Sequence, residues 1–156
     1  MGVDGFRLDA IPYLIEEGDQ LAHTPGTHAV LREYARYLHE IAPRAYTIGE
    51  VWDSIGAVMP YYPDQLYAHF AFEVSDAILD AVRTGSAKRL LPPVLRLQRA
   101  LPADRWSPFL RNHDQTRTLT ALGGDIASAK LAATILLTLP GLPYVYYGEE
   151  IGMTGD

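Results

Sequence analysis

The sequence contains no cysteine. This absence excludes disulfide bonds, thiolate metal sites and a cysteine nucleophile, but it leaves the cellular compartment open. Long apolar runs are also missing, because the longest, residues 131–139, is far shorter than the roughly 20 residues of a membrane-spanning helix. We therefore expect a soluble protein without a membrane partner, in the cytoplasm or secreted, with the compartment itself unknown.

Positive charge is scarce and dispersed. The chain has 13 Lys and Arg against 19 Asp and Glu, for a net charge of −6, and the basic residues do not cluster. This pattern argues against a nucleic-acid partner and favours a neutral or polar substrate. The hydrophobic fraction of 48% and the charged fraction of 21% are typical of globular domains, so a packed core is expected.

Short apolar segments alternate with longer amphipathic ones, which predicts βαβ units around a parallel sheet and an α/β fold. The expected strands are residues 6–9, 46–50, 69–74, 107–112 and 144–147. Four helices are expected. The first runs from Pro25 to Pro43, and its apolar face consists of Val30, Leu31, Tyr34, Leu38 and Ile41. The second, residues 75–82, is capped by Ser75 and followed by Gly85; the third, residues 87–101, is interrupted by Pro92 and Pro93; and the fourth, residues 127–139, lies between Asp125 and Gly141. Residues 53–65 are rich in Gly, Pro and Tyr and are expected to form a loop.

Three expected strands end in an acid: Asp9, Glu50 and Asp114. In a (β/α)₈ barrel the active site lies at the carboxyl ends of the strands. Asp9 and Glu50 are 41 residues apart and Glu50 and Asp114 are 64 apart, against about 31 residues for one barrel unit. The acids thus come from three of four neighbouring strands and converge on one face.

The residue types fit glycoside hydrolysis, which uses a proton-donating carboxylic acid and a carboxylate on the other side of the scissile bond. Arg7 and Asp9 share one face of their strand, and a nearby arginine stabilises the charged carboxylate that a nucleophile needs. Glu50, with Trp52 nearby, is the candidate acid. Asp114, beside His113, is the candidate for holding substrate hydroxyls and the cationic transition state.

Three motifs resemble the second, third and fourth signature regions of the α-amylase family: residues 5–10 (GFRLDA), 49–52 (GEVW) and 111–117 (RNHDQTR). Residues 143–148 resemble the eighth barrel strand of that family. The resemblance implies a retaining mechanism with Asp9 as nucleophile, Glu50 as general acid/base and Asp114 as transition-state stabiliser. It also implies substrate contacts by Arg7, His113, Trp52 and Arg117.

By the same mapping, residues 1–156 are a single segment of a TIM-barrel catalytic domain that is truncated at both ends. The segment corresponds to the C-terminal half of the barrel, strands four to eight, and the family's first signature region is absent. We expect the chain to be poorly active or unstable alone, or to self-associate through its open sheet edges. No cofactor is expected, although many family members hold calcium partly through the upstream region, so a longer parent protein has room for that ion.

Asp9 followed by Ala10 resembles family members that act on α-1,4 links, and residues 147–153 resemble amylases and glucosidases. The resemblance therefore implies an α-1,4-linked glucan or malto-oligosaccharide as substrate. Asp9, Ala10, Pro12 and Tyr13 also resemble trehalose synthases, which leaves a transglycosylase or isomerase as the alternative.

Two further classes stay open at this stage. One is a barrel that only binds glucans, against which the three intact acids argue. The other is a metal-dependent hydrolase, which needs pairs of histidines at strand ends. Only His113 lies at such a position, which argues against this class. The spacing of the other histidines does not suggest a metal site: His23, His28, His39 and His69. The loop tyrosines are open to either sugar stacking or packing: Tyr61, Tyr62 and Tyr67.

Overall fold

The computed structural model describes residues 2–155. The chain divides into two compact units, Met1–Phe70 and Ala71–Asp156. Both units combine short strands with longer helices, which confirms the α/β class. Within residues 2–155, no helix has both the length and the apolar character needed to cross a membrane.

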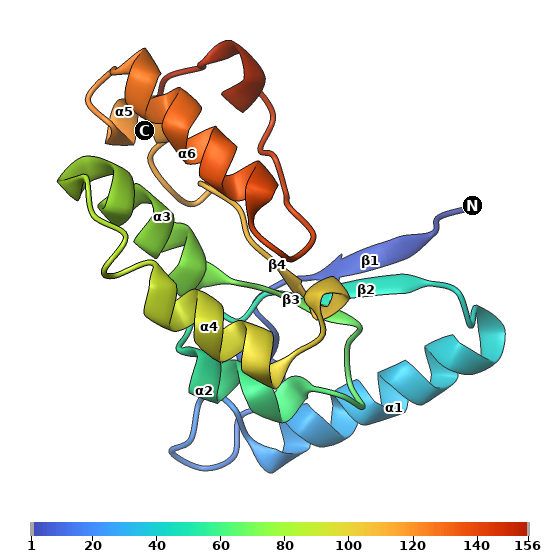
Figure 1. The fold of residues 1–156 in the computed structure, drawn as a ribbon. Coiled ribbons are helices and arrows are strands. Elements are labelled where there is room, and N and C mark those ends of the chain that lie inside the picture. The colour runs from blue at the N-terminus through green and yellow to red at the C-terminus, as the bar shows by residue number, and fades with distance from the viewer. Residues whose placement is uncertain (1, 156) are drawn as a thin grey trace. The chain divides into compact units, whose positions relative to one another are not determined.

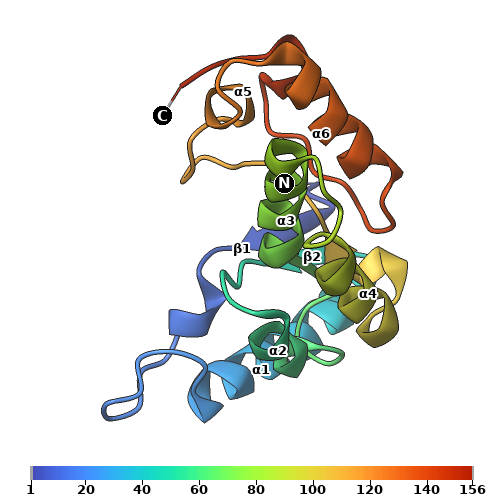
Figure 2. The ribbon, with the colours of Figure 1, turned by 60° about the vertical axis from the view of Figure 1, so that its left-hand side comes forward.

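The first unit is built on three parallel strands, β1 (Gly5–Leu8), β2 (Tyr46–Gly49) and β3 (Ala68–Phe70). The middle strand is β2: its Gly49 lies opposite Leu8 on β1 and opposite His69 on β3. The connections carry η1 (Ile11–Tyr13), α1 (Pro25–Ile41), α2 (Ile55–Val58) and η2 (Met59–Tyr61). Figures 1 and 2 show α1 and α2 on the same side of β1 and β2.

Local chemistry explains where α1 begins. Thr24 is extended, and its hydroxyl accepts a hydrogen bond of 3.0 Å from the Thr27 amide, while Pro25 occupies the first turn, where its missing N–H costs nothing. The expected apolar face is only partly buried. Leu31 and Leu38 face the core, whereas Val30 and Ile41 are 43% and 61% exposed.

Some of this exposed apolar surface surrounds a hollow of about 500 Å³ between β1 and α1. Phe6 of β1 and Ile41 of α1 both line it. Phe6 is 46% exposed although it lies on a strand. The core of the first unit lies elsewhere, and its buried members are Ile11, Leu31, Val51, Val58, Tyr61 and Leu66.

The loop prediction for residues 53–65 is wrong. Ser54 caps α2 by accepting a hydrogen bond from the Ala57 amide, and Pro60 lies in the first turn of η2, where its fixed φ suits a helix. Tyr61 is fully buried, so for this residue packing is the correct interpretation.

The second unit consists mainly of helices. These are α3 (Phe72–Thr84), α4 (Leu91–Ala100), α5 (Thr118–Ala121) and α6 (Ile126–Thr138), with η3 (Ala103–Arg105), the short strand β4 (Trp106–Ser107) and η4 (Glu149–Ile151). Helix α3 packs against both α4 and α6 (Figure 1). Asp125 caps α6 as predicted, accepting bonds from the amides of Ala127 and Ser128.

Two helix predictions in this unit need correction. Helix α3 begins before Ser75, whose hydroxyl donates to the Ala71 carbonyl oxygen and accepts from the Phe109 amide instead of capping the helix. The helix ends as predicted, with Gly85 in the left-handed conformation at φ 63°. Pro92 and Pro93 lie in the first turn of α4 and do not interrupt it.

Of the last two strand predictions, the first was too long and the second is wrong. Residues 107–112 contribute only Ser107 to a strand, and residues 144–147 form none. Backbone bonds still link the two segments, from the Leu142 amide to the Trp106 oxygen and from the Tyr144 amide to the Pro108 oxygen, each 2.9 Å. Pro108 has no N–H to donate back to the second segment, which interrupts the ladder.

Candidate active site

The carboxyl ends of β1 and β2 place two acids next to each other. Leu8 lies opposite Gly49 in the parallel register, and Asp9 and Glu50 each follow directly after their strand. The carboxyl ends of neighbouring parallel strands share one edge of the sheet, where α/β proteins bind their ligands. Both acids therefore emerge at the edge where a binding site is expected.

Arg7 connects the two acids. Its Nη1 lies 2.8 Å from Asp9 Oδ1, and its Nη2 lies 2.8 Å from Glu50 Oε2. The planar guanidinium can serve two carboxylates because its donors point in fixed, different directions. One side chain thus sets the relative position of both acids.

The backbone after β1 also holds Glu50. Ala10 has the left-handed φ of 43°, and its amide donates a 3.2 Å bond to Glu50 Oε2. The Ile11 amide donates to the Glu50 carbonyl oxygen at 3.2 Å. Glu50 is only 8% exposed, whereas the Asp9 side chain is 71% exposed. The pair therefore consists of one sheltered carboxyl and one open carboxylate.

Gly49 is required by close packing beneath Glu50. A Cβ at this position would lie 2.4 Å from Leu66 Cδ1 and 2.8 Å from Ile11 Cδ1. Only glycine lets β2 pass this point without displacing the core. Trp52 follows Glu50 by two residues and is 55% exposed, so solvent can reach its indole.

The remaining predicted site residues belong to the second unit. His113 Nε2 lies 3.3 Å from Asp114 Oδ2, and the Asp114 amide donates to Asn112 Oδ1 at 3.1 Å. Both members of the pair are half-exposed, at 55% and 50% of their side-chain surface. A turn anchored by Asn112 therefore presents His113 and Asp114 together.

Arg117 rests on an aromatic surface. Its guanidinium carbon lies 4.7 Å from the centre of the Tyr146 ring and 4.5 Å from that of Tyr147, and its Nη1 donates to the Tyr147 carbonyl oxygen at 2.7 Å. These contacts fix the guanidinium through cation–π attraction and one hydrogen bond. The residue is thereby held beside the segment that resembles the eighth strand.

Glu149 is a supporting residue in the same region. Its carboxylate accepts bonds from the Thr118 hydroxyl and the Tyr146 amide. Burial raises the pKa of Glu149, although these bonds and the Arg117 charge oppose the shift. Glu149 therefore links the start of α5 to the segment that ends in η4.

No metal-binding group of three His, Asp or Glu side chains occurs within residues 2–155. His23 and His28 take part in hydrogen-bonded networks around Tyr61, and His69 is buried on β3. Sequence reasoning missed two contributors near the acids: the Ala10 amide and the His23 imidazole. Neither carries a sequence signal, because Ala and His rarely adopt the positive φ that they have here.

The whole chain is similar to proteins of one enzyme family. The family model for the α-amylase catalytic domain matches residues 1–156. Alpha-amylase 3 of Dictyoglomus thermophilum is 39% identical over 99% of this chain, and the trehalose synthase of Thermus thermophilus is 33% identical over all of it. The matches cover 30% and 20% of those two proteins.

Solved structures give the same result. The crystal structure of α-amylase from H. orenii aligns with a TM-score of 0.84 and 34% identity, covering 99% of this chain and 32% of that one. The maltose complex of the cyclic α-maltosyl-(1→6)-maltose hydrolase from Arthrobacter globiformis aligns at 0.82 and 30%, covering 99% and 33%. The chain thus spans a third or less of these relatives and forms a partial (β/α)₈ barrel, as expected. It belongs to the α-amylase family.

Proposed function

We propose that this chain carries the acids of a retaining glycoside hydrolase acting on α-1,4-glucosidic bonds of malto-oligosaccharides or starch-like glucans. The observation that carries the proposal is the Arg7 bridge, which holds an exposed and a sheltered carboxyl at adjacent strand ends. Retaining glycosidases need two such carboxyl groups close together, with different roles. The membership of the α-amylase family supports this chemistry.

In the first step, an Asp9 oxygen attacks the anomeric carbon while the glycosidic C–O bond breaks. Glu50 donates its proton to the departing oxygen, so the leaving sugar is released as an alcohol and an ester forms on Asp9. In the second step, Glu50 takes a proton from water, the water oxygen attacks the anomeric carbon, and the ester bond breaks. Two inversions give a product with the original α-configuration.

The surroundings of the two acids differ. Asp9 faces solvent, where a sugar ring can approach its carboxylate. Arg7 and the Ala10 amide both contact Oε2 of Glu50, so we assign the mobile proton to Oε1. Arg7 neutralises part of the charge of the pair and keeps the nucleophile oriented before substrate arrives.

The remaining predicted residues would act on the sugar. Asp114 would stabilise the cationic transition state and hold hydroxyl groups, with His113 as its neighbour. Trp52 offers an exposed ring for stacking beside Glu50, and Arg117 offers donors to a sugar hydroxyl.

A mechanism-based cyclitol epoxide that traps the nucleophile tests the assignment, because the labelled peptide can be identified by mass spectrometry. We expect one label, on Asp9, and none after Asp9→Asn. Asp19→Asn, which changes an exposed acid on the following loop, is the matched control and should label like the parent. A label on another residue, or no label at all, would refute the proposal.

A trehalose synthase-like isomerase is the second candidate. It is supported by the 33% identity to the Thermus thermophilus trehalose synthase and by Pro12 and Tyr13 after the nucleophile. Products formed from maltose separate the two activities. Glucose alone indicates hydrolysis, whereas trehalose indicates isomerisation through the same Asp9 ester.

A further inference from the structure

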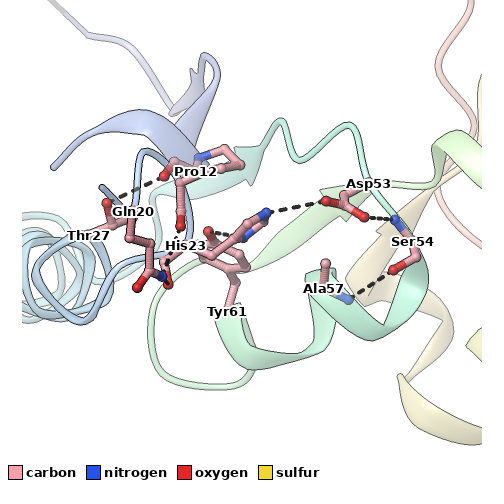
Figure 3. Close-up of polar contacts among 9 residues, drawn as sticks. Pro12, Gln20, His23, Thr27, Asp53, Ser54, Ala57 and Tyr61 are labelled. Atoms are coloured by element: carbon pink, nitrogen blue, oxygen red, sulfur yellow. Dashed lines mark hydrogen bonds and ion pairs between the residues drawn. The ribbon is translucent and has the colours of Figure 1, made fainter. Parts of the chain in front are cut away.

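One imidazole lies between the two loops that follow the acids (Figure 3). The first loop is the connection of residues 10–24 after Asp9, which includes η1, and the second is the connection of residues 51–61 after Glu50, which includes α2 and η2. His23, on the first loop, contacts two side chains of the second: its Nδ1 is 2.9 Å from the Tyr61 hydroxyl, and its Nε2 is 3.3 Å from Asp53 Oδ2. Both ring nitrogens of His23 are therefore used across the gap between loops.

The backbone of His23 is held just as firmly. Its amide donates a 2.9 Å bond to the Pro12 carbonyl oxygen, and its carbonyl oxygen accepts a 3.1 Å bond from Gln20 Nε2. The residue has φ 55°, a conformation that is unfavourable for a side chain with a Cβ. A strained backbone persists only where surrounding contacts enforce it.

The tautomer of His23 follows from its neighbours. Tyr61 is fully buried, and burial, with the charges of Asp53 and Tyr13 as smaller causes, raises its pKa to about 12. Its hydroxyl therefore keeps its proton. Because the Asp53 carboxylate can only accept, Nε2 of His23 is the donor toward it, and in the neutral imidazole Nδ1 then accepts from the Tyr61 hydroxyl. A backbone bond from Ser54, with a smaller contribution from His23, lowers the pKa of Asp53 and keeps it charged.

Short chains of contacts connect this imidazole to Glu50. On the first loop, the Pro12 carbonyl oxygen accepts a hydrogen bond from the His23 amide, and Pro12 lies in η1. Ile11 begins η1, and its amide donates to the Glu50 carbonyl oxygen. On the second loop, the Asp53 amide donates to the Val51 carbonyl oxygen, one residue after Glu50. His23 thus holds both backbone segments adjoining the acids.

We infer that His23 is a positioning residue for the Asp9 and Glu50 pair: by linking Pro12, Tyr61 and Asp53 it fixes the loop that carries the Ala10 amide against Glu50. The inference rests on the proposed function, since it assigns His23 a part in that reaction. His23 itself does not touch the substrate in this scheme. It acts through the Ala10 amide: loss of the His23 side chain would weaken the hydrogen bond from this amide to Glu50 Oε2.

Nuclear magnetic resonance on the whole chain tests the link without needing turnover. In His23→Ala, we expect hydrogen exchange at the Ala10 amide to rise by about tenfold, the effect of losing one ordinary hydrogen bond. The amides of Leu31 and Leu38, buried in α1, should keep their exchange rates. His39→Ala, on the exposed side of α1, is the matched control and should leave Ala10 unchanged.

Two further variants separate positioning from general stability. His23→Gln keeps a donor directed at Asp53 and should restore part of the protection of Ala10. Asp53→Asn tests the same link without changing the strained residue, so it decides the matter if His23→Ala does not fold. Unchanged exchange at Ala10 in these variants, equal acceleration at Leu31, or a proton found on Nδ1 of His23 by long-range ¹⁵N correlation would each overturn the inference.

The rate at which the cyclitol labels Asp9 then relates the geometry to the chemistry. We expect slower labelling in His23→Ala and partial recovery in His23→Gln. If the parent labels and His23→Ala labels at the same rate, the positioning role is wrong while the proposed function stands. If the parent never labels Asp9, the proposed function fails, and a positioning role in that reaction fails with it, whatever the exchange data show about the loops.

Discussion

His69 makes the stability of the first unit depend on pH. The residue lies on β3 opposite Gly49 and is 1% exposed, and neither ring nitrogen has a hydrogen-bond partner within the described residues. A charge at this position would be buried without compensation. Burial accordingly lowers the pKa of His69 from 6.5 to about 4. The folded unit therefore accommodates only the neutral ring at ordinary pH.

The direction and size of the effect follow from linkage. Above pH 6.5 the ring is neutral in both the folded and the unfolded state, so His69 has no pH-dependent cost. As the pH falls from 6.5 toward 4, the unfolded chain binds a proton that the folded unit excludes, and the free energy of unfolding decreases. At 1.36 kcal/mol per pKa unit the loss approaches about 3 kcal/mol near pH 4, where it levels off.

The test compares the parent with His69→Leu, which replaces the ring by an apolar side chain of similar volume. Urea unfolding followed by circular dichroism gives the free energy of unfolding at neutral pH and near pH 4. We expect the variant to be at least as stable as the parent at neutral pH, because it removes two unsatisfied nitrogens. Its advantage should grow by about 3 kcal/mol on acidification.

Acidic residues also titrate in this range, so only the difference between parent and variant is informative. His39→Gln, which changes an exposed histidine of α1, serves as the control and should follow the parent at every pH. If His69→Leu also followed the parent down to pH 4, the buried neutral imidazole would not be the cause of acid sensitivity. A His69 ring proton that titrates near 6.5 in the folded chain would refute the reasoning directly.

Three other substitutions test the packing, capping and edge arguments. Gly49→Ala should lower the free energy of unfolding in urea by about 1–3 kcal/mol, because the added Cβ would lie 2.4 Å from Leu66 Cδ1. Gly56→Ala is the control: the nearest neighbour of its Cβ is 3.8 Å away, so its stability should not change. Equal effects of the two substitutions would refute the packing argument. Asp125→Ala should lower the melting temperature through loss of the α6 cap, and an unchanged melting temperature would contradict the capping argument. Phe6→Lys should reduce self-association in sedimentation velocity, because it places a charge on the exposed, apolar edge strand β1. If the parent stays monomeric at all concentrations, the expected self-association through open sheet edges is wrong.

Much of the first unit was predictable because its signals are local. Thr24 and Pro25 mark the start of α1, and strand ends coincide with the segments that carry Asp9 and Glu50. The contact between Arg7 and Asp9 also follows from the two-residue period of a strand. These features depend on residues that are neighbours in the chain, so the sequence alone is sufficient to read them.

Errors arose where distant contacts or missing donors decide the structure. The aromatic segment 53–65 folds into α2 and η2 because Tyr61 packs into a core formed by residues from several elements. The strand expected at 144–147 fails because Pro108, in its partner segment, has no N–H to continue the ladder. Composition cannot show either effect, since both depend on which segments meet.

The same distinction applies to the chemistry of the acid pair. Strand register brings Asp9 and Glu50 to one edge of the sheet, and both acids lie in the sequence motifs at residues 5–10 and 49–52. The orientation of the two acids depends in addition on the Ala10 amide and on the loops joined by His23. His23 belongs to none of the motifs. A relative can therefore keep both acids while its loops hold them differently. An α-amylase and a trehalose synthase both match this chain. If the proposed Asp9 ester forms, we expect the loops to decide between hydrolysis and isomerisation by admitting water or retaining the sugar.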